Sequence, residues 1–121
     1  MKKILLVDNE ARLRRVVRLT LGDDFDILEA SDGQEAVQLA GKEMPDLIFL
    51  DIGMPGMDGF AACAAIKNNP LTGHIPVVML TGHEEREYKE RGRVVGADEY
   101  FVKPFSPRAL LDKVYEVLGD P

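Results

Sequence analysis

Five short apolar runs recur along the chain, each bounded by polar or turn-forming residues. They cover residues 4–7, 25–30, 46–50, 75–80 and 99–102. The third run contains four consecutive large apolar residues, Leu47 to Leu50, and this is typical of a strand that is buried on both faces of a parallel sheet. The sequence therefore predicts five strands.

Between these runs the apolar residues recur at spacings of three and four, which predicts helices. The first helix follows residue 10, ends at Gly22 and has an inner face formed by Leu13, Val16, Val17, Thr20 and Leu21. We expect its four arginines on the opposite face, either solvated or docking an acidic partner: Arg12, Arg14, Arg15 and Arg18.

The later helices carry clear start and stop signals. Ser31-Asp32-Gly33 opens a helix whose end is marked by Gly41 and Pro45, and an alanine-rich helix covers 59–67. Ser106 as N-cap and Pro107 at the first helical position open the last helix, 106–118. The helix over 83–94 is almost entirely charged and contains Gly92, so we expect it to be the least stable element.

Five strands that alternate with five helices through short loops predict an α/β protein with a doubly wound, five-stranded parallel sheet. The 121 residues are the size of one domain, so we expect a single unit over 1–121. The chain ends about where the last helix ends, and both a stand-alone protein and part of a longer one remain open.

Composition narrows the possible partners and compartment. The formal net charge of −6 argues against direct nucleic acid binding. The single cysteine, Cys63, lies among alanines and is interpreted as a buried small hydrophobe in a reducing compartment. The apolar run after Lys2 and Lys3 is too short for a signal peptide, and no segment approaches membrane-spanning length, so we expect a cytoplasmic protein with no membrane contact.

Chemically useful residues follow four of the strands. Because parallel strands place their carboxyl ends at one edge of the sheet, Asp8 with Asn9, Asp51, Thr81 and Lys103 are expected to converge there. Carboxylates suit Mg²⁺, while a lysine and a hydroxyl suit phosphoryl oxygens, and a carboxylate can itself accept a phosphoryl group. Each residue alone is explained as well by helix capping or solvation, but the set together favours phosphoryl chemistry.

Four motifs carry a resemblance that spans residues 2–118. They are Val7-Asp8-Asn9-Glu10, the segment 50–59 (Leu-Asp-Ile-Gly-Met-Pro-Gly-Met-Asp-Gly), Leu80-Thr81-Gly82 and the segment 96–105 (Gly-Ala-Asp-Glu-Tyr-Phe-Val-Lys-Pro-Phe). In this order and spacing the chain resembles a receiver domain of the response regulators of two-component signal transduction. The resemblance implies a flavodoxin-like (βα)5 fold and a phosphorelay protein.

The resemblance also implies roles for individual residues. Asp51 would accept a phosphoryl group from a histidine kinase or a histidine phosphotransfer protein. Asp8, Asn9, Asp51 and the backbone carbonyl of Gly53 would hold Mg²⁺. Thr81 and Lys103 would contact the phosphoryl group.

A conformational switch is implied as well. Thr81 and Tyr100 would change the face formed by helix 83–94, strand 99–102 and helix 106–118, and a downstream protein or a fused output domain would bind there. Such a domain is not a turnover enzyme, because it catalyses only its own phosphorylation and dephosphorylation.

One position departs from the family pattern. Receivers usually have two acids after the first strand, and Asn9 stands where the second would be. An amide oxygen can still coordinate Mg²⁺, but one negative charge is missing, so we expect weakened Mg²⁺ affinity.

Three other interpretations compete with this one. A Mg²⁺-dependent phosphatase would need a second aspartate where Gly53 stands, and a flavin carrier would need a phosphate-cradling loop where Asp8 and Glu10 lie. The main alternative is a degenerate receiver that acts as a phosphorylation-independent binding module, with Asn9 as the first sign of decay.

Overall fold

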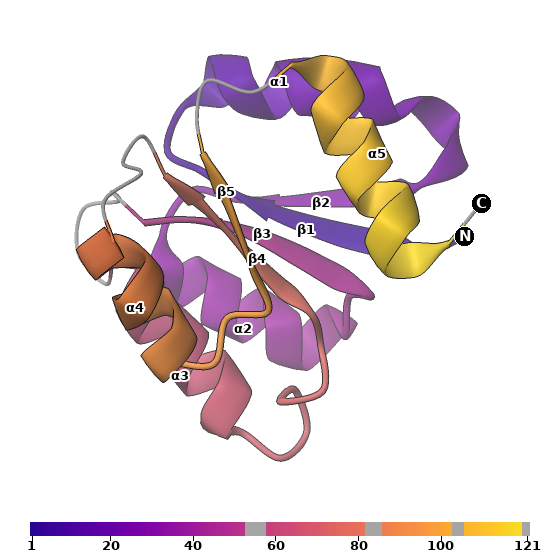
Figure 1. Ribbon diagram of the computed structural model, residues 1–121. Coiled ribbons are helices and arrows are strands. Elements are labelled where there is room, and N and C mark those ends of the chain that lie inside the picture. Colours follow the sequence, from indigo (N-terminus) through magenta and orange to yellow (C-terminus); the bar gives the residue numbers. More distant parts are fainter. Residues whose placement is uncertain (53–57, 82–85, 103–105, 120–121) are drawn as a thin grey trace.

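The computed structural model describes residues 1–52, 58–81, 86–102 and 106–119, and for residues 86–89 only the backbone. Within these residues, five parallel strands form one sheet (Figure 1). The elements are β1 (Lys3–Val7), α1 (Ala11–Leu21), η1 (Gly22–Asp24), β2 (Asp26–Ala30), α2 (Gly33–Glu43), β3 (Leu47–Asp51), α3 (Gly59–Asn68), β4 (Val77–Thr81), α4 (Arg86–Val94), β5 (Glu99–Val102) and α5 (Pro107–Leu118). The predicted doubly wound α/β fold is confirmed.

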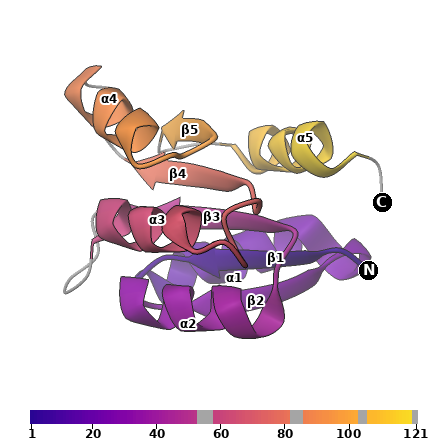
Figure 2. The ribbon, with the colours of Figure 1, turned by 90° about the horizontal axis from the view of Figure 1, so that it is seen from below.

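The order of the strands determines where the carboxyl ends meet. It is β2-β1-β3-β4-β5, and it reverses direction between β1 and β3. Helices α1 and α5 cover one face of the sheet, and α2, α3 and α4 cover the other (Figures 1 and 2). In open parallel sheets, ligands bind at such a reversal point beyond the strand ends.

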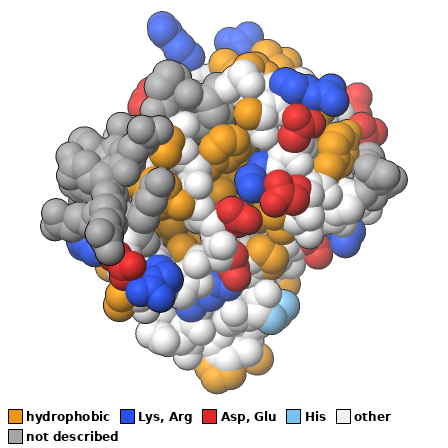
Figure 3. All heavy atoms as spheres, in the orientation of Figure 1, with side chains coloured by type: hydrophobic (Ala, Val, Ile, Leu, Met, Phe, Trp, Pro, Cys, Tyr) orange, Lys and Arg blue, Asp and Glu red, His pale blue; other side chains and the backbone are white. Residues whose placement is uncertain are grey.

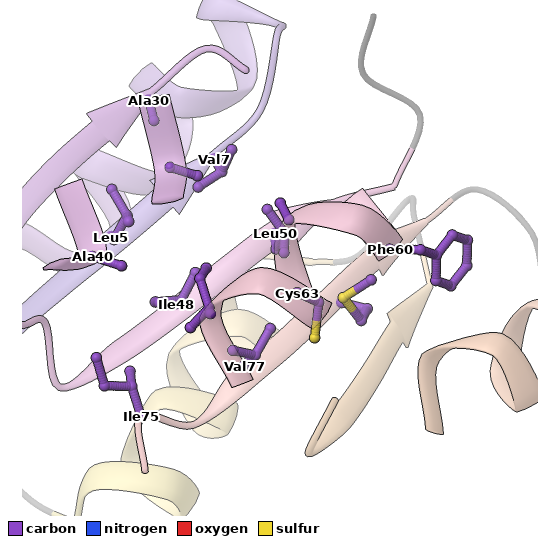
Figure 4. Close-up of a cluster of buried hydrophobic side chains, with 14 of the residues drawn as sticks. Leu5, Val7, Ala30, Ala40, Ile48, Leu50, Phe60, Cys63, Ile75 and Val77 are labelled. Carbon is purple, nitrogen blue, oxygen red and sulfur yellow. The ribbon is translucent and has the colours of Figure 1, made fainter. Parts of the chain in front are cut away.

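Each face of the sheet has its own core because side chains alternate along the strands. Leu5, Ile48 and Val77 face α2 and α3, and Figure 4 shows Ile48 and Val77 beside Cys63 of α3. Burial raises the pKa of the Cys63 thiol to about 11, and its Sγ lies 3.7 Å from the carbonyl oxygen of Val95. Cys63 is thus the buried small hydrophobe that was predicted.

Side-chain caps begin three of the helices. Ser106 accepts a hydrogen bond from the amide of Ala109 at 3.0 Å, as predicted, and Pro107 opens α5. Asp32 and Asp58 cap α2 and α3 in the same way, each at 2.8 Å. These caps satisfy amides that a helix cannot pair internally.

Helix α2 ends at Glu43, between Gly41 and Pro45 as predicted, and Met44 then takes a left-handed conformation with φ 49°. One expectation about α1 was wrong: Val16 is 43% exposed, so the inner face of α1 depends instead on Val17 and Leu21. The predicted stop of α1 at Gly22, which has a φ of 65°, is confirmed.

Helix α4 is described over Arg86–Val94, and the predicted residues 83–85 lie outside the described part. Gly92 is buried, and a Cβ built there would lie 3.8 Å from Ala97 Cβ, 3.9 Å from Met79 Cγ and 4.0 Å from Tyr100 Cδ2. These are ordinary van der Waals distances, so a methyl group would fit between α4 and the sheet at this position. No helix in the described ranges is long and apolar enough to cross a membrane.

A polar network ties the start of β4 to the segment before β5. Lys67 Nζ lies 2.7 Å from Asp98 Oδ2 and donates to the carbonyl oxygen of Ile75 at 2.6 Å. The same Asp98 oxygen accepts from the amide of Val77 at 2.8 Å. The Lys67 side chain is only 12% exposed, so its charge depends on these partners.

We expect Asp98→Ala to lower the free energy of unfolding by about 1–3 kcal/mol, because Lys67 and the Val77 amide lose a shared partner. Urea unfolding followed by circular dichroism measures the effect. The matched control is Asp112→Ala, which removes an exposed pair with Arg108 and should cost less than about 0.5 kcal/mol. Equal losses would show that the Asp98 network adds nothing beyond an ordinary surface pair.

The first residue of α3 packs directly against the end of β3. A Cβ on Gly59 would lie 2.4 Å from the backbone oxygen of Asp51 and 2.8 Å from Ile52 Cα. The amide of Gly59 also donates to the Ile52 carbonyl at 3.3 Å. Only glycine permits this approach, so the helix start supports the strand end that carries Asp51.

Gly59→Ala should therefore destabilise the protein by about 1–3 kcal/mol, since backbone atoms must move to make room. Gly41→Ala makes the same chemical change within α2, where a Cβ meets nothing within 4 Å, and should stabilise by about 0.5–1 kcal/mol. Thermal unfolding of both variants tests the pair. A neutral Gly59→Ala would mean that β3 and α3 separate at no cost.

Candidate functional site

Two carboxylates lie buried at the reversal point of the sheet. Asp8 is 0% exposed and Asp51 is 7% exposed. Val7 pairs with Leu50 across β1 and β3, so Asp8 and Asp51 come one position later on adjacent strands. The structure therefore brings together the two acids that the sequence placed at this edge.

Thr81 joins them from the next strand. It is 2% exposed, and the neighbouring Leu80 pairs with Asp51. Among the described residues only one other polar side chain is as deeply buried, Thr72, which donates to the Ile66 carbonyl at 2.7 Å. Burial of polar side chains is thus concentrated at the carboxyl edge of β1, β3 and β4.

Strand alternation assigns these residues to different faces of the sheet. Leu6 and Phe49 face α1 and α5, and so do Asp8 and Asp51 two positions later. Met79 and Tyr100 pack in the opposite core, which places Thr81 on the same face as Tyr100. The two predicted switch residues therefore share the face that α4 covers.

The segment after β1 is ordered by Asp8 itself. Its Oδ1 accepts a hydrogen bond from the amide of Glu10 at 2.9 Å, and its own amide donates to the Ala30 carbonyl at 3.1 Å. Glu10 is the N-cap of α1 and makes no side-chain cap hydrogen bond. Asp8 thus supports the helix start with one oxygen, and Asn9 beside it is exposed.

Gly53 and Lys103 lie outside the described residues. Lys103 directly follows Val102, which pairs with Thr81 at the end of β5. The predictions for these two residues therefore remain predictions.

The expected outer-face position of the α1 arginines is wrong for Arg14, and Arg18 makes an ion pair that was not foreseen. Arg14 Nε donates to Glu29 Oε1 at 3.2 Å, Arg18 Nη2 donates to Glu29 Oε2 at 2.6 Å, and Arg14 Nη1 also donates to the carbonyl oxygen of Asp8. Arg14, whose side chain is 19% exposed, is thus largely buried against β2, whereas Arg18 is 50% exposed and pairs with Glu29 at the surface. Glu29 could have indicated this pairing from the sequence, because an acid inside an apolar strand needs a partner.

The chemistry of the site suits a hard cation. Asp8 and Asp51 offer carboxylate oxygens on adjacent strands, and Mg²⁺ typically takes one or two carboxylates with water and phosphate oxygens. No group of three or more acidic, histidine or cysteine side chains that could hold a metal occurs in the ranges the structure describes. Any Mg²⁺ here would need amide, backbone or water oxygens as further ligands.

Comparison with known proteins agrees with this geometry. The family model of the response regulator receiver domain matches residues 4–115. The chain is 40% identical over 118 residues to the alkaline phosphatase synthesis transcriptional regulatory protein PhoP of Bacillus subtilis, a match that covers 97% of this chain and 48% of that protein. It spans about half the length of the transcriptional regulators that it matches.

Solved structures show the same fold. The chemotaxis protein CheY4 of Vibrio cholerae is 38% identical with a TM-score of 0.92, over 98% of this chain and 99% of that one. The receiver domain of the sensor histidine kinase PA1611 of Pseudomonas aeruginosa is 25% identical with a TM-score of 0.89, over 98% of both chains, and has a magnesium ion in its active-site cleft. Family match, sequence identity and fold agree, and the chain belongs to the receiver domains of two-component response regulators.

Proposed function

We propose that residues 1–121 act as one receiver unit that accepts a phosphoryl group on Asp51 with the help of Mg²⁺. The observation that carries the proposal is the burial of Asp51 beside Asp8 at the reversal point of the sheet. A carboxylate there is withdrawn from water yet lies at the edge where ligands reach parallel sheets. Thr81 on the next strand supplies a hydroxyl for a phosphoryl oxygen.

In the proposed reaction an Asp51 carboxylate oxygen attacks the phosphorus of a phosphohistidine. The new bond is P–O, the P–N bond breaks, and the imidazole of the donor leaves. Mg²⁺, held by Asp8, Asn9, Asp51 and the carbonyl of Gly53, would neutralise charge on the phosphoryl oxygens. Thr81 and Lys103 would contact that group, which makes the domain a phosphoacceptor rather than a turnover enzyme.

The proposed output is a change on the face formed by α4, β5 and α5. Thr81 and Tyr100 share one side of the sheet, and α4 lies over that side with the buried Gly92 facing Tyr100. Figure 3 shows charged side chains of both signs among apolar ones on the face that carries β5 and α5. Lys113 of α5 lies there, 3.5 Å from Glu99 and 3.2 Å from Glu116, and a downstream protein or fused output domain would bind this face.

Helix α1 is the proposed docking surface for the histidine kinase or phosphotransfer protein. Arg12 and Arg15 are exposed, and Leu19 (73% exposed) and Val16 lie among them. Exposed apolar residues surrounded by positive charge suit an amphipathic, acidic partner helix. The net charge of −6 supports protein rather than nucleic acid partners for this domain, and we place it in the cytoplasm without membrane contact.

A second candidate is a degenerate receiver that binds partners without phosphorylation. The observation that favours it is Asn9, an exposed amide where the family usually has an acid. The two candidates differ in whether Asp51 can be phosphorylated.

Incubation with acetyl phosphate and Mg²⁺ should add one phosphoryl group to the wild-type protein and none to Asp51→Asn, as read by intact-mass spectrometry. The amide of Asp51→Asn has almost the same shape but is no nucleophile. If the wild type is not phosphorylated at any Mg²⁺ concentration and Asn9→Asp is, the result would support the binding module instead.

Asn9→Asp should tighten Mg²⁺ binding by about tenfold, because a restored negative charge worth about 1.4 kcal/mol changes affinity by that factor. Isothermal titration with MgCl2 measures it. Gln34→Glu, which adds the same charge on the exposed surface of α2, is the control and should leave the affinity unchanged. Equal affinity in wild type and Asn9→Asp would exclude position 9 from the metal site.

A further inference from the structure

The guanidinium of Arg14 lies directly behind the segment that carries Asp8. Its side chain is 19% exposed, and its Nη1 donates to the carbonyl oxygen of Asp8. Its Nε donates to Glu29 of β2, which also accepts from Arg18 at 2.6 Å. Glu29 thus holds the arginine at the angle from which it reaches the Asp8 peptide.

The described contacts hold Asp8 at three atoms. Its amide donates to Ala30 at 3.1 Å, its Oδ1 accepts from the amide of Glu10 at 2.9 Å, and its carbonyl oxygen accepts from Arg14. The first contact joins two backbone groups and the second joins the Asp8 side chain to a backbone amide, so neither depends on the side chain of another residue. The third depends on one side chain, and it fixes the peptide that joins Asp8 to Asn9.

We propose that Arg14 is a positioning residue for Mg²⁺ binding, acting through the Asp8–Asn9 peptide. The inference rests on the proposed function, in which Asp8 and Asn9 are metal ligands. A ligand that is already oriented loses less conformational freedom when the ion binds, and groups that orient metal ligands typically change affinity by about 10–100-fold.

Two other roles for Arg14 predict different results. If it acted only through its charge, it would repel the cation, so its removal would tighten Mg²⁺ binding. If it only anchored α1 to β2, Arg18 would matter equally, because Arg18 binds Glu29 and the Ile27 carbonyl but makes no described contact with Asp8. The positioning role predicts a loss of affinity that is specific to Arg14.

The experiment is a MgCl2 titration followed by amide chemical shifts in ¹⁵N-labelled protein, at a temperature where circular dichroism shows every variant folded. Arg14→Ala and Arg14→Lys should both weaken Mg²⁺ binding by about tenfold. Lysine keeps the charge, but it lacks the planar guanidinium that donates to Glu29 and to the Asp8 carbonyl at the same time. Arg15→Ala, an exposed neighbour with the same charge change, and Arg18→Ala should bind like the wild type.

A second readout needs no metal. The Asn9 amide belongs to the peptide that Arg14 holds. Without Mg²⁺, its chemical shift should change more, and its hydrogen should exchange with solvent faster, in Arg14→Ala than in Arg18→Ala. If Arg14→Ala does not fold, the same measurements are made on Arg14→Lys and Glu29→Gln. Glu29→Gln should weaken Mg²⁺ binding by a smaller factor than Arg14→Lys.

The outcomes separate the two proposals. If the wild type binds Mg²⁺ and Arg14→Ala binds it equally well or more tightly, the positioning role is overturned and the receiver site is left intact. An equal loss in Arg18→Ala also overturns it, in favour of helix anchoring. Absence of any Mg²⁺-dependent shift in the wild type overturns the metal site itself and this inference with it.

Discussion

Burial of two like charges side by side is the constraint on which the functional edge depends. Asp8 and Asp51 follow paired residues of adjacent strands and are almost inaccessible to solvent. Such a pair is unfavourable unless hydrogen bonds, a cation or protonation compensates it. The proposed Mg²⁺ would supply such a cation.

The supports for the two acids come from opposite sides of the sheet. Behind Asp8, Arg14 reaches from α1 to the carbonyl oxygen and is itself held by Glu29. Behind Asp51, Gly59 lets the start of α3 lie against the strand backbone. One support is an ion pair with a directional donor and the other is a steric fit, so substitutions would disturb them in different ways.

The far half of the sheet is built differently. A Cβ on Gly92 of α4 would lie at van der Waals distance from Met79 and Tyr100, and Arg91 stacks on the Phe60 ring with its Cζ 4.1 Å from the centroid. Lys67 and Asp98 hold the segment that leads into β5. At Gly92, α4 thus leaves room for a further methyl group, in contrast to the steric fit at Gly59.

The sequence by itself determined the five strands, the helix order, the Ser106 cap and the edge where Asp8, Asp51 and Thr81 meet. Short-range periodicity and turn residues encode these features, and parallel topology follows from them. Only the tertiary structure decided that Arg14 and Arg18 bind Glu29, that Val16 faces solvent and that Asp98 pairs with Lys67. Periodicity tells which side of a helix is apolar, but the partner of a long charged side chain depends on which distant segment packs beside it.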